Sequence, residues 1–412
     1  MRGIAVLGIL GAAGFSSAEA SNYVDAVAEE IEVGPAGGWV RLFRDEATDG
    51  WHFLWAAGGD YIRLPMTAGL EVNDMGRTQL TGRTDLVDHA ITACPGGGYL
   101  HVASANKESF NDSAYAFRYD SDFNLLAAGT LEEAEPNRFH NDLPILCTPE
   151  LDATAFIASN HGATSLSVIG ADATQESLHT LSNEVPRTEG GSLRMDPETG
   201  EVIVVGKSHS GKEFEVVALD ANFEVTWKKS FRPLTDTALR PYWPQALMKI
   251  NDHFLLAFMA RDDNAGFSSD WGNAYLAVLD AEYEHLETIQ ISFYEPPEGG
   301  QRPGIARKGD QLLLTMDRNV QPVVFPIRLN AEAFGIEATE DTGGWWDTSA
   351  SGGSGSGNGD ETAGDGCSCA SKAEPASTAW WGVGLAAFGL VRRRSARRGV
   401  PTNGTPGADS TL

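Results

Sequence analysis

The chain repeats one pattern about every 50 residues, and this repeat constrains the fold more than any other feature. Each unit contains an extended apolar segment, a tight turn, a second segment, a polar loop, a third segment, a second tight turn and a fourth segment. The residues that open this second tight turn are spaced by 50, 50, 60 and 50 residues: Asp120, Gly170, Asp220, Asp280 and Asn330. The apolar runs are short and bounded by Gly, Asp, Asn and Pro, which is typical of strands.

Six such units can be aligned, and they predict one closed all-β domain. The units cover residues 39–72, 89–131, 143–181, 192–231, 246–292 and 304–337. One four-stranded meander cannot bury both of its faces, whereas sheets packed around an axis can. We therefore expect a six-bladed β-propeller of four-stranded blades over residues 39–340, after a helical or extended lead-in at 21–38. The domain resembles the broad class of YWTD-like and NHL-like propellers, without a signature that selects one family.

Two details of the repeat are specific predictions. The fourth strand of the first unit is expected at residues 69–72, and that of the last unit is expected to begin at Phe334. An aspartate that opens the turn can bond the backbone amide two residues on. We therefore expect these aspartates to stabilise the turns locally, and we do not predict that they bind a metal.

The N-terminus predicts export. Arg2 precedes an apolar run, residues 4–15, and Ala18-Glu19-Ala20 has the small-x-small pattern of a signal-peptide cleavage site. We expect residues 1–20 to be a signal peptide, cut after Ala20.

In an oxidising compartment Cys94 and Cys147 could pair. They end the first strands of consecutive units, and a disulfide needs Cα atoms within roughly 7 Å, so the sequence leaves the bridge open.

The C-terminus changes character after residue 340. Residues 341–366 are rich in Gly, Ser and Asp and predict a disordered, flexible linker. A Cys-Ser-Cys segment follows, then Pro375, an apolar run at 379–391 that predicts a short hydrophobic helix, and a cluster of arginines. This run is shorter than the roughly 20 residues of a comfortable transmembrane helix. It suits a transient stop in the inner membrane with the arginines in the cytoplasm, and the alternative is an ordinary anchor helix.

Together these features resemble the MYXO-CTERM type of C-terminal sorting signal, over residues 367–398. The resemblance implies cleavage near the cysteines by a sorting protease of the inner membrane. Cys367 or Cys369 would then be the processing and lipidation site, and the protein would be displayed at the cell surface or outer membrane. The chain departs from the family pattern in continuing past the arginines, with a tail at 399–412 that we expect to be disordered.

The charge of the chain narrows the range of partners. It has 30 Lys and Arg against 57 Asp and Glu, a formal net charge of −27. A strongly acidic body disfavours nucleic acid and anionic membranes. We therefore expect no nucleic-acid partner, and contact with the membrane only through the C-terminal tail.

Arginine recurs where the chain enters a unit, near five of the six first strands. These loops share one face of a propeller, and bidentate arginine grips carboxylate or sulfate groups. We therefore predict a ligand site for an acidic glycan or a peptide carboxylate. Its candidate residues are Arg83, His89, Arg138, His140, Arg187, Arg240, Tyr242, Trp243, Trp271 and Arg302. The competing hypothesis is that the arginines form ion pairs with neighbours such as Asp85, Asp142 and Glu189.

One inserted loop, residues 262–273, lies on the same face. Trp271 could stack on a sugar, and Asp262, Asp263 and Asp270 could bind Ca²⁺, although their spacing matches no known Ca²⁺ loop. An ordinary exposed polar insertion is the alternative. No other cofactor is predicted.

No catalytic residue is predicted, because the recurring residues are Arg, His and aromatics rather than the carboxylate pair of a hydrolase. The sequence favours a non-enzymatic, surface-displayed propeller that binds a glycan, a peptide or a partner protein. Two alternatives stay open: an extracellular propeller enzyme of the glycoside hydrolase, lyase or lactonase type, and a structural coat protein.

Overall fold

Strands dominate the part of the chain that the computed structural model describes. This part is residues 21–339 without 35, 46, 96, 106–113, 132–143, 148–154, 162, 209–210, 237 and 263–270. It belongs to a single structural unit, Met1–Gly352. The expected signal peptide, linker, sorting signal and tail lie outside the described residues. Within them, no helix is long and apolar enough to cross a bilayer.

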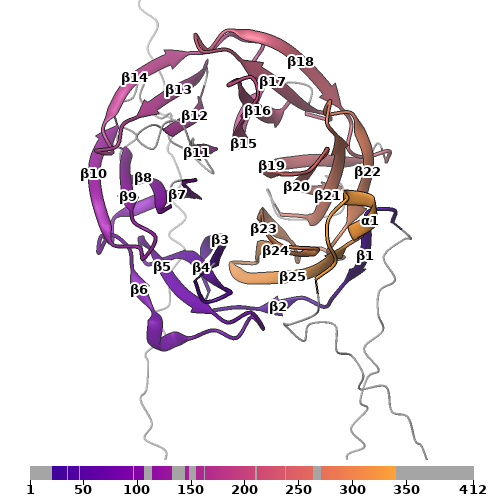
Figure 1. Cartoon of the computed structure of the whole chain (residues 1–412), viewed down its shortest axis with the longest axis horizontal. Coiled ribbons are helices and arrows are strands. Elements are labelled where there is room, and N and C mark those ends of the chain that lie inside the picture. The colour runs from indigo at the N-terminus through magenta and orange to yellow at the C-terminus, as the bar shows by residue number, and fades with distance from the viewer. Residues whose placement is uncertain are drawn as a thin grey trace, which may run out of the picture. The chain divides into compact units, whose positions relative to one another are not determined.

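The strands form antiparallel sheets that follow one another around a ring (Figure 1). The first sheet contains β3 (Gly38–Asp45), β4 (Gly50–Ala57), β5 (Asp60–Met66) and β6 (Thr78–Gln79), with a 3-10 turn at Asp74–Gly76. The second contains β7 (Leu86–Ala93), β8 (Tyr99–Ala105), β9 (Ala114–Tyr119) and β10 (Leu125–Leu131), and the third β11 (Ile145–Cys147), β12 (Ala155–His161), β13 (Ala163–Ile169) and β14 (Gln175–Thr180). The fourth contains β15 (Arg187–Met195), β16 (Val202–Lys207), β17 (Phe214–Leu219) and β18 (Val225–Phe231), and the fifth β19 (Leu239–Ile250), β20 (His253–Asp262), β21 (Asn273–Asp280) and β22 (His285–Gln290). The sixth contains β23 (Gly300–Lys308), β24 (Gln311–Arg318), β25 (Gln321–Leu329), β1 (Val24–Val27) and β2 (Ile31–Glu32).

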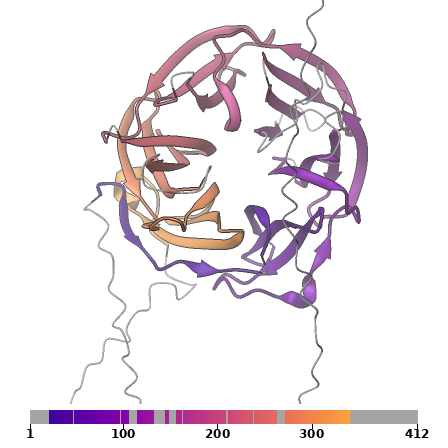
Figure 2. The same ribbon diagram turned by 180° about the vertical axis from the view of Figure 1, so that it is seen from behind.

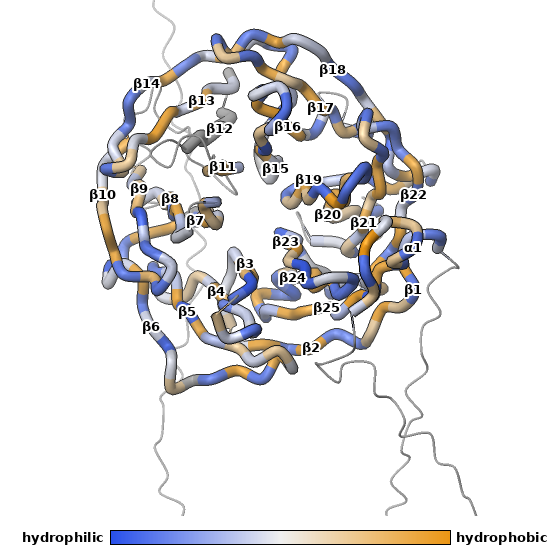
Figure 3. The backbone as a smooth tube through the Cα atoms, in the orientation of Figure 1, coloured by the Kyte–Doolittle hydropathy of each residue, from blue (hydrophilic) through white to orange (hydrophobic). Residues whose placement is uncertain are grey.

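This arrangement is the all-β propeller that the repeat predicts. The first strands β3, β7, β11, β15, β19 and β23 surround the centre of the ring, and Figure 2 shows the same ring from behind. Middle strands such as β4 are buried along nearly their whole length, because both faces of each sheet pack against neighbouring sheets. Outer strands such as β18 alternate partly buried and exposed residues, and Figure 3 shows hydrophobic and hydrophilic residues interspersed along the strands of the ring.

The predicted fourth strand of the last unit is wrong. Residues Ala331–Phe334 form the short helix α1, because the Asn330 side chain accepts a hydrogen bond from the amide of Ala333 at 3.1 Å and caps the turn. Gly335 ends the helix in the left-handed conformation. The outer edge of β25 is instead covered by β1 and β2, from the expected lead-in. The N-terminal end of the domain therefore closes the ring against its C-terminal end.

The fourth strand of the first unit is also displaced. Only one bridge, between Met66 and Val72, forms in the predicted stretch. Leu70 there has a φ of 66° and a buried side chain, so its backbone turns instead of extending. The outer strand is β6, at Thr78–Gln79.

The repeated aspartates have the local role expected of them. The carboxylates of Asp120, Asp220 and Asp280 each accept hydrogen bonds from the amides two and four residues on, at 2.8–3.0 Å. The bonds hold the third residue after the aspartate at positive φ, and at Phe123 and Tyr283 this turn buries an aromatic ring.

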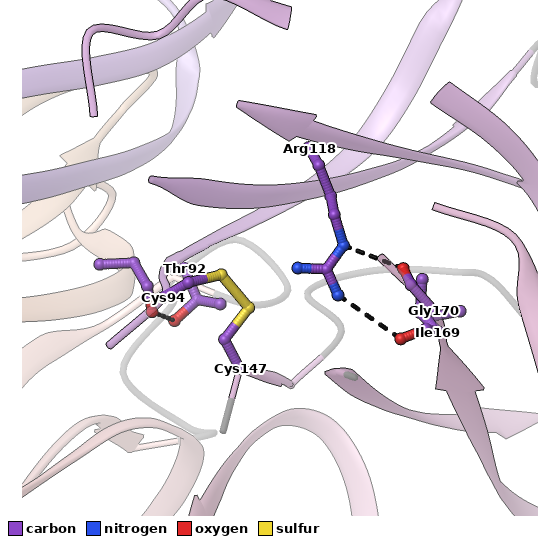
Figure 4. Close-up of a disulfide and its surroundings, with 7 residues drawn as sticks. Thr92, Cys94, Arg118, Cys147, Ile169 and Gly170 are labelled. Carbon is purple, nitrogen blue, oxygen red and sulfur yellow. Dashed lines mark hydrogen bonds between the residues drawn. A yellow bond between two sulfur atoms is a disulfide. The ribbon is translucent and has the colours of Figure 1, made fainter. Parts of the chain in front are cut away.

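A disulfide and a buried arginine link the second and third sheets (Figure 4). Cys94 follows β7 and Cys147 ends β11. The structure joins them with a Cα–Cα distance of 4.9 Å, within the reach of a disulfide. Arg118 of β9 donates hydrogen bonds to the carbonyls of Gly170, at 3.0 Å, and Ile169, at 3.5 Å. Both links cross between neighbouring sheets.

Candidate ligand-binding site

Most first strands begin with a β-bulge. The pairing register shifts near the start of β3, β7, β15, β19 and β23. Four residues within these bulges have positive φ: Trp39, Gly190, Trp243 and Arg302. A bulge re-aims its side chain. Here the bulges bring side chains from consecutive sheets together at one end of the first strands.

Arg302 lies between two indole rings in this group. Its guanidinium carbon is 4.4 Å from the centre of the Trp39 ring and 5.1 Å from that of Trp243. Asp317, which is fully buried, pairs with it at 3.5 Å and also accepts a hydrogen bond of 2.9 Å from the Trp39 amide. We call Trp39, Trp243, Arg302 and Asp317 the buried arginine network. It connects the fifth, sixth and first sheets.

The network corrects part of the predicted site. Arg302 and Trp243 are only 9% and 7% exposed, and their partners lie within the fold. A β-carbon at Gly190 would come within 2.4 Å of the Trp243 ring, so this glycine makes room for the indole. Arg83 is ion-paired as well: it binds both carboxylate oxygens of Asp85, at 2.9 and 2.6 Å. At Arg83 and Arg302 the ion-pair hypothesis therefore holds.

His89 lies in the core rather than in a loop. Its Nδ1 is 3.0 Å from Nε2 of His101, and the Tyr61 ring packs 4.9 Å from both imidazoles. Burial lowers the pKa of His89 to about 4 and that of His101 well below its usual value. Both rings are therefore neutral near pH 7 and belong to the packing around Trp39, 5.8 Å from His89.

Two of the other predicted arginines, Arg187 and Arg240, lie beside further basic residues on the fourth and fifth sheets. In the strand ladders Arg187 lies directly opposite Lys207, and Arg240 directly opposite Arg261. Tyr242 lies between the two sheets, with Lys207 Nζ 3.5 Å and the Arg261 guanidinium 4.9 Å from its ring centre. We call these five residues the basic rim.

Two of the rim residues, Lys207 and Arg261, are missing from the sequence prediction. Each sits at the end of a second strand, opposite the arginine at the start of the first strand. Counting along the predicted hairpins does not find them, because the bulges shift the pairing register between Arg187 and Ser192 and between Tyr242 and Ala246. Arg187 and Arg240 are exposed, whereas Lys207 and Arg261 are partly buried against Tyr242.

The remaining predictions are only partly covered by the structure. Trp271 is partly exposed and precedes β21, and Asp262 ends β20. The other candidates for ligand, Ca²⁺ and processing sites lie outside the described residues: Arg138, His140, Asp263, Asp270, Cys367 and Cys369. In the described ranges, no group of three or more His, Cys, Asp and Glu side chains is placed to hold a metal ion.

The chain is similar in structure to proteins of several kinds. A protein of unknown function from Dyadobacter fermentans matches with a TM-score of 0.55 and 11% identity, over 74% of this chain and 99% of that one. Hydrazine synthase from Kuenenia stuttgartiensis matches at 0.42 and 12%, over 69% and 78%. An exo-β-1,3-galactanase from Phanerochaete chrysosporium matches at 0.39 and 10%, over 76% and 71%. At such identities the likeness concerns the fold alone. No family model and no curated protein sequence matches the chain.

Proposed function

We propose that this protein is a non-enzymatic, surface-displayed propeller that binds a carboxylated or sulfated glycan at the basic rim. The observation that carries the proposal is the pairing of like charges, Arg187 with Lys207 and Arg240 with Arg261. An acidic ligand that bridges the two pairs gains charge-assisted hydrogen bonds from them.

A glycan suits this surface better than an acidic peptide because of its aromatic neighbour. Trp271 precedes Gly272, which lies against Arg261: a β-carbon at Gly272 would come 3.0 Å from the Arg261 Cβ. An indole offers a flat apolar face on which a sugar ring can stack. The body is acidic overall, so attraction to a polyanion is local to the rim and is weakened by salt.

The proposal also includes the number of blades and the cellular location of the protein. Each of the six sheets is one blade, and β1 and β2 complete the sixth blade and close the ring. The signal peptide, residues 1–20, exports the chain, and the cysteine-containing signal at 367–398 delivers it to the cell surface. A variant with Cys367→Ala and Cys369→Ala tests the proposed delivery to the cell surface. We expect it to stay unprocessed and off the surface, and normal display would refute this part.

An array of acidic and neutral glycans tests the binding proposal. We expect the wild type to bind carboxylated or sulfated members, and Arg240→Ala to lose roughly tenfold in affinity, the effect of about 1.4 kcal/mol. Arg77→Ala is the matched control, because Arg77 is an exposed arginine that directly precedes β6 of the first sheet. Binding of acidic peptides in place of glycans would move the proposal to a protein partner, and no binding to any acidic ligand would refute it.

A further inference from the structure

The strand ends of the fifth sheet form a row that leads from the basic rim to the outside of the ring. Figure 1 shows the strands of this sheet in the order β19, β20, β21 and β22 from the centre outwards. Arg240 of β19 pairs with Arg261 of β20, and Asn273 at the start of β21 pairs with Ala260, the residue before Arg261. Neighbouring strands lie about 4.8 Å apart, so the segment that follows β22 at this end of the sheet lies roughly 14 Å from Arg240.

Phe293, in that outer segment, is an aromatic residue that is 56% exposed. Its backbone is held on both sides by the Asn273 side chain. Asn273 Oδ1 accepts hydrogen bonds from the Ser292 hydroxyl at 3.1 Å and from the Tyr294 amide at 2.6 Å, and Nδ2 donates to the Tyr294 carbonyl at 3.3 Å. An exposed ring on a fixed backbone can pack against a ligand at a small cost in conformational entropy.

The charge changes sign along this row. Its inner end has the cations of the basic rim, whereas Glu295 and Glu298 follow Phe293 at its outer end and are both exposed. The Glu298 amide donates to the Glu295 carbonyl at 2.9 Å, so a tight turn keeps both residues close to the end of the row. An acid group on a ligand is therefore attracted at the inner end and repelled at the outer end.

We propose that the rim and Phe293 belong to one binding surface, which selects an oligosaccharide with its acid group at one end and neutral sugars along the rest. The acid group binds at Arg240 and Arg261, and a neutral sugar stacks on Phe293. A single sugar is too short to contact both ends of the row. A chain with an acid group on every sugar would bring negative charge to Glu295 and Glu298. This inference rests on the proposed function of the rim, and it adds the length and the charge pattern of the ligand.

Calorimetric titration of the mature protein with four defined probes tests the inference. The representative ligand is xylotriose that carries one glucuronate. D-glucuronate supplies the acid group alone, xylotetraose supplies neutral sugars alone, and tetragalacturonate has an acid group on every sugar. We expect the representative ligand to bind roughly tenfold more tightly than glucuronate or xylotetraose, and about threefold more tightly than tetragalacturonate.

Variants at the outer end assign the two effects. Phe293→Ala should bind the representative ligand roughly tenfold more weakly and glucuronate as the wild type does, because only the longer ligand reaches the ring. Leu126→Ala is the matched control, because Leu126 is an apolar residue of β10 that is 67% exposed, and it should change neither affinity. Glu295→Gln with Glu298→Gln should raise the affinity for tetragalacturonate about threefold and leave that for the representative ligand unchanged.

The outcomes separate this inference from the function on which it rests. If Phe293→Ala binds the representative ligand as tightly as the wild type while Arg240→Ala loses it, the rim stands and the extended surface is wrong. An unchanged affinity of the double glutamate variant for tetragalacturonate would contradict the selection by charge. If no probe binds, or if Arg240→Ala binds every probe as the wild type does, the rim itself is wrong and this inference falls with it.

Discussion

The buried arginine network and the basic rim use the same residue at the same place in the repeat, with opposite consequences. Arg302 and Arg240 both lie in first strands of adjacent sheets, near the strand start. Arg302 is buried and has the carboxylate of Asp317 and two indole rings around it. Arg240 is exposed and lies opposite another cation, Arg261. The neighbours supplied by adjacent strands and sheets decide whether such an arginine is buried within the fold or lies on its surface.

The largest effect is expected when the buried network is broken. Asp317→Ala leaves Arg302 as a buried cation without its carboxylate and removes an acceptor from the Trp39 and Val40 amides. Loss of one partner of a buried pair costs about 3–5 kcal/mol. Urea unfolding should show this decrease in the free energy of unfolding. A change below about 1 kcal/mol would show that the network contributes little to stability.

The rim should behave in the opposite way under the same measurement. Arg240→Ala changes an exposed surface side chain, so its effect on the free energy of unfolding should stay within about 0.5 kcal/mol. The comparison fails if Arg240→Ala destabilises the protein as much as Asp317→Ala does.

Removal of the disulfide should lower the thermal stability of the protein without changing its affinity for a glycan. Cys94→Ser with Cys147→Ser opens a loop whose ends are 53 residues apart in sequence. A cross-link of this kind contributes about 2–4 kcal/mol. Thermal unfolding should shift to lower temperature, while the affinity of the folded protein for an acidic glycan stays unchanged. Equal midpoints for the wild type and the double variant would contradict the first expectation.

Acid should weaken the packing of His89 beside Trp39 and spare the rim. The pKa of His89 is about 4 in the folded state against 6.5 for the ordinary group, so the unfolded chain takes up the proton first. Stability should therefore fall as the pH decreases from 6.5 towards 4, by about 3 kcal/mol from this residue alone. His89→Asn should reduce the pH dependence of the free energy of unfolding over this range by the share of this residue, and the lowered pKa values of His101 and His52 should maintain the rest. The Arg and Lys charges of the rim do not change there.

Much of the fold could be predicted from the sequence, because each unit carries its own turns. The Asp120 type of turn is fixed by residues within four positions of one another, so it can be read locally. The closing strand could not be found in this way, since β1 is four residues long and pairs with β25, some 300 residues later. The weak strand pattern after Asn330 was the one indication in the sequence that another segment covers the outer edge of β25.

The candidate site was predictable in position but not in role. The recurrence of arginine located Arg187, Arg240 and Arg302 at the starts of first strands. Their partners Lys207, Arg261 and Asp317 come from other strands, and their burial depends on packing between sheets. A single sequence does not reveal these contacts, because the residues come together only when the strands pair and the sheets pack.

The most direct test is the affinity of a double rim variant, Arg187→Ala with Arg240→Ala, for dextran sulfate and polygalacturonate. It should bind whichever polymer the wild type binds at least tenfold more weakly, or about 1.4 kcal/mol, with an unchanged unfolding midpoint. Added salt should weaken wild-type binding more than binding by the variant. Wild-type affinity in the folded double variant would contradict the claim that the rim is the binding surface.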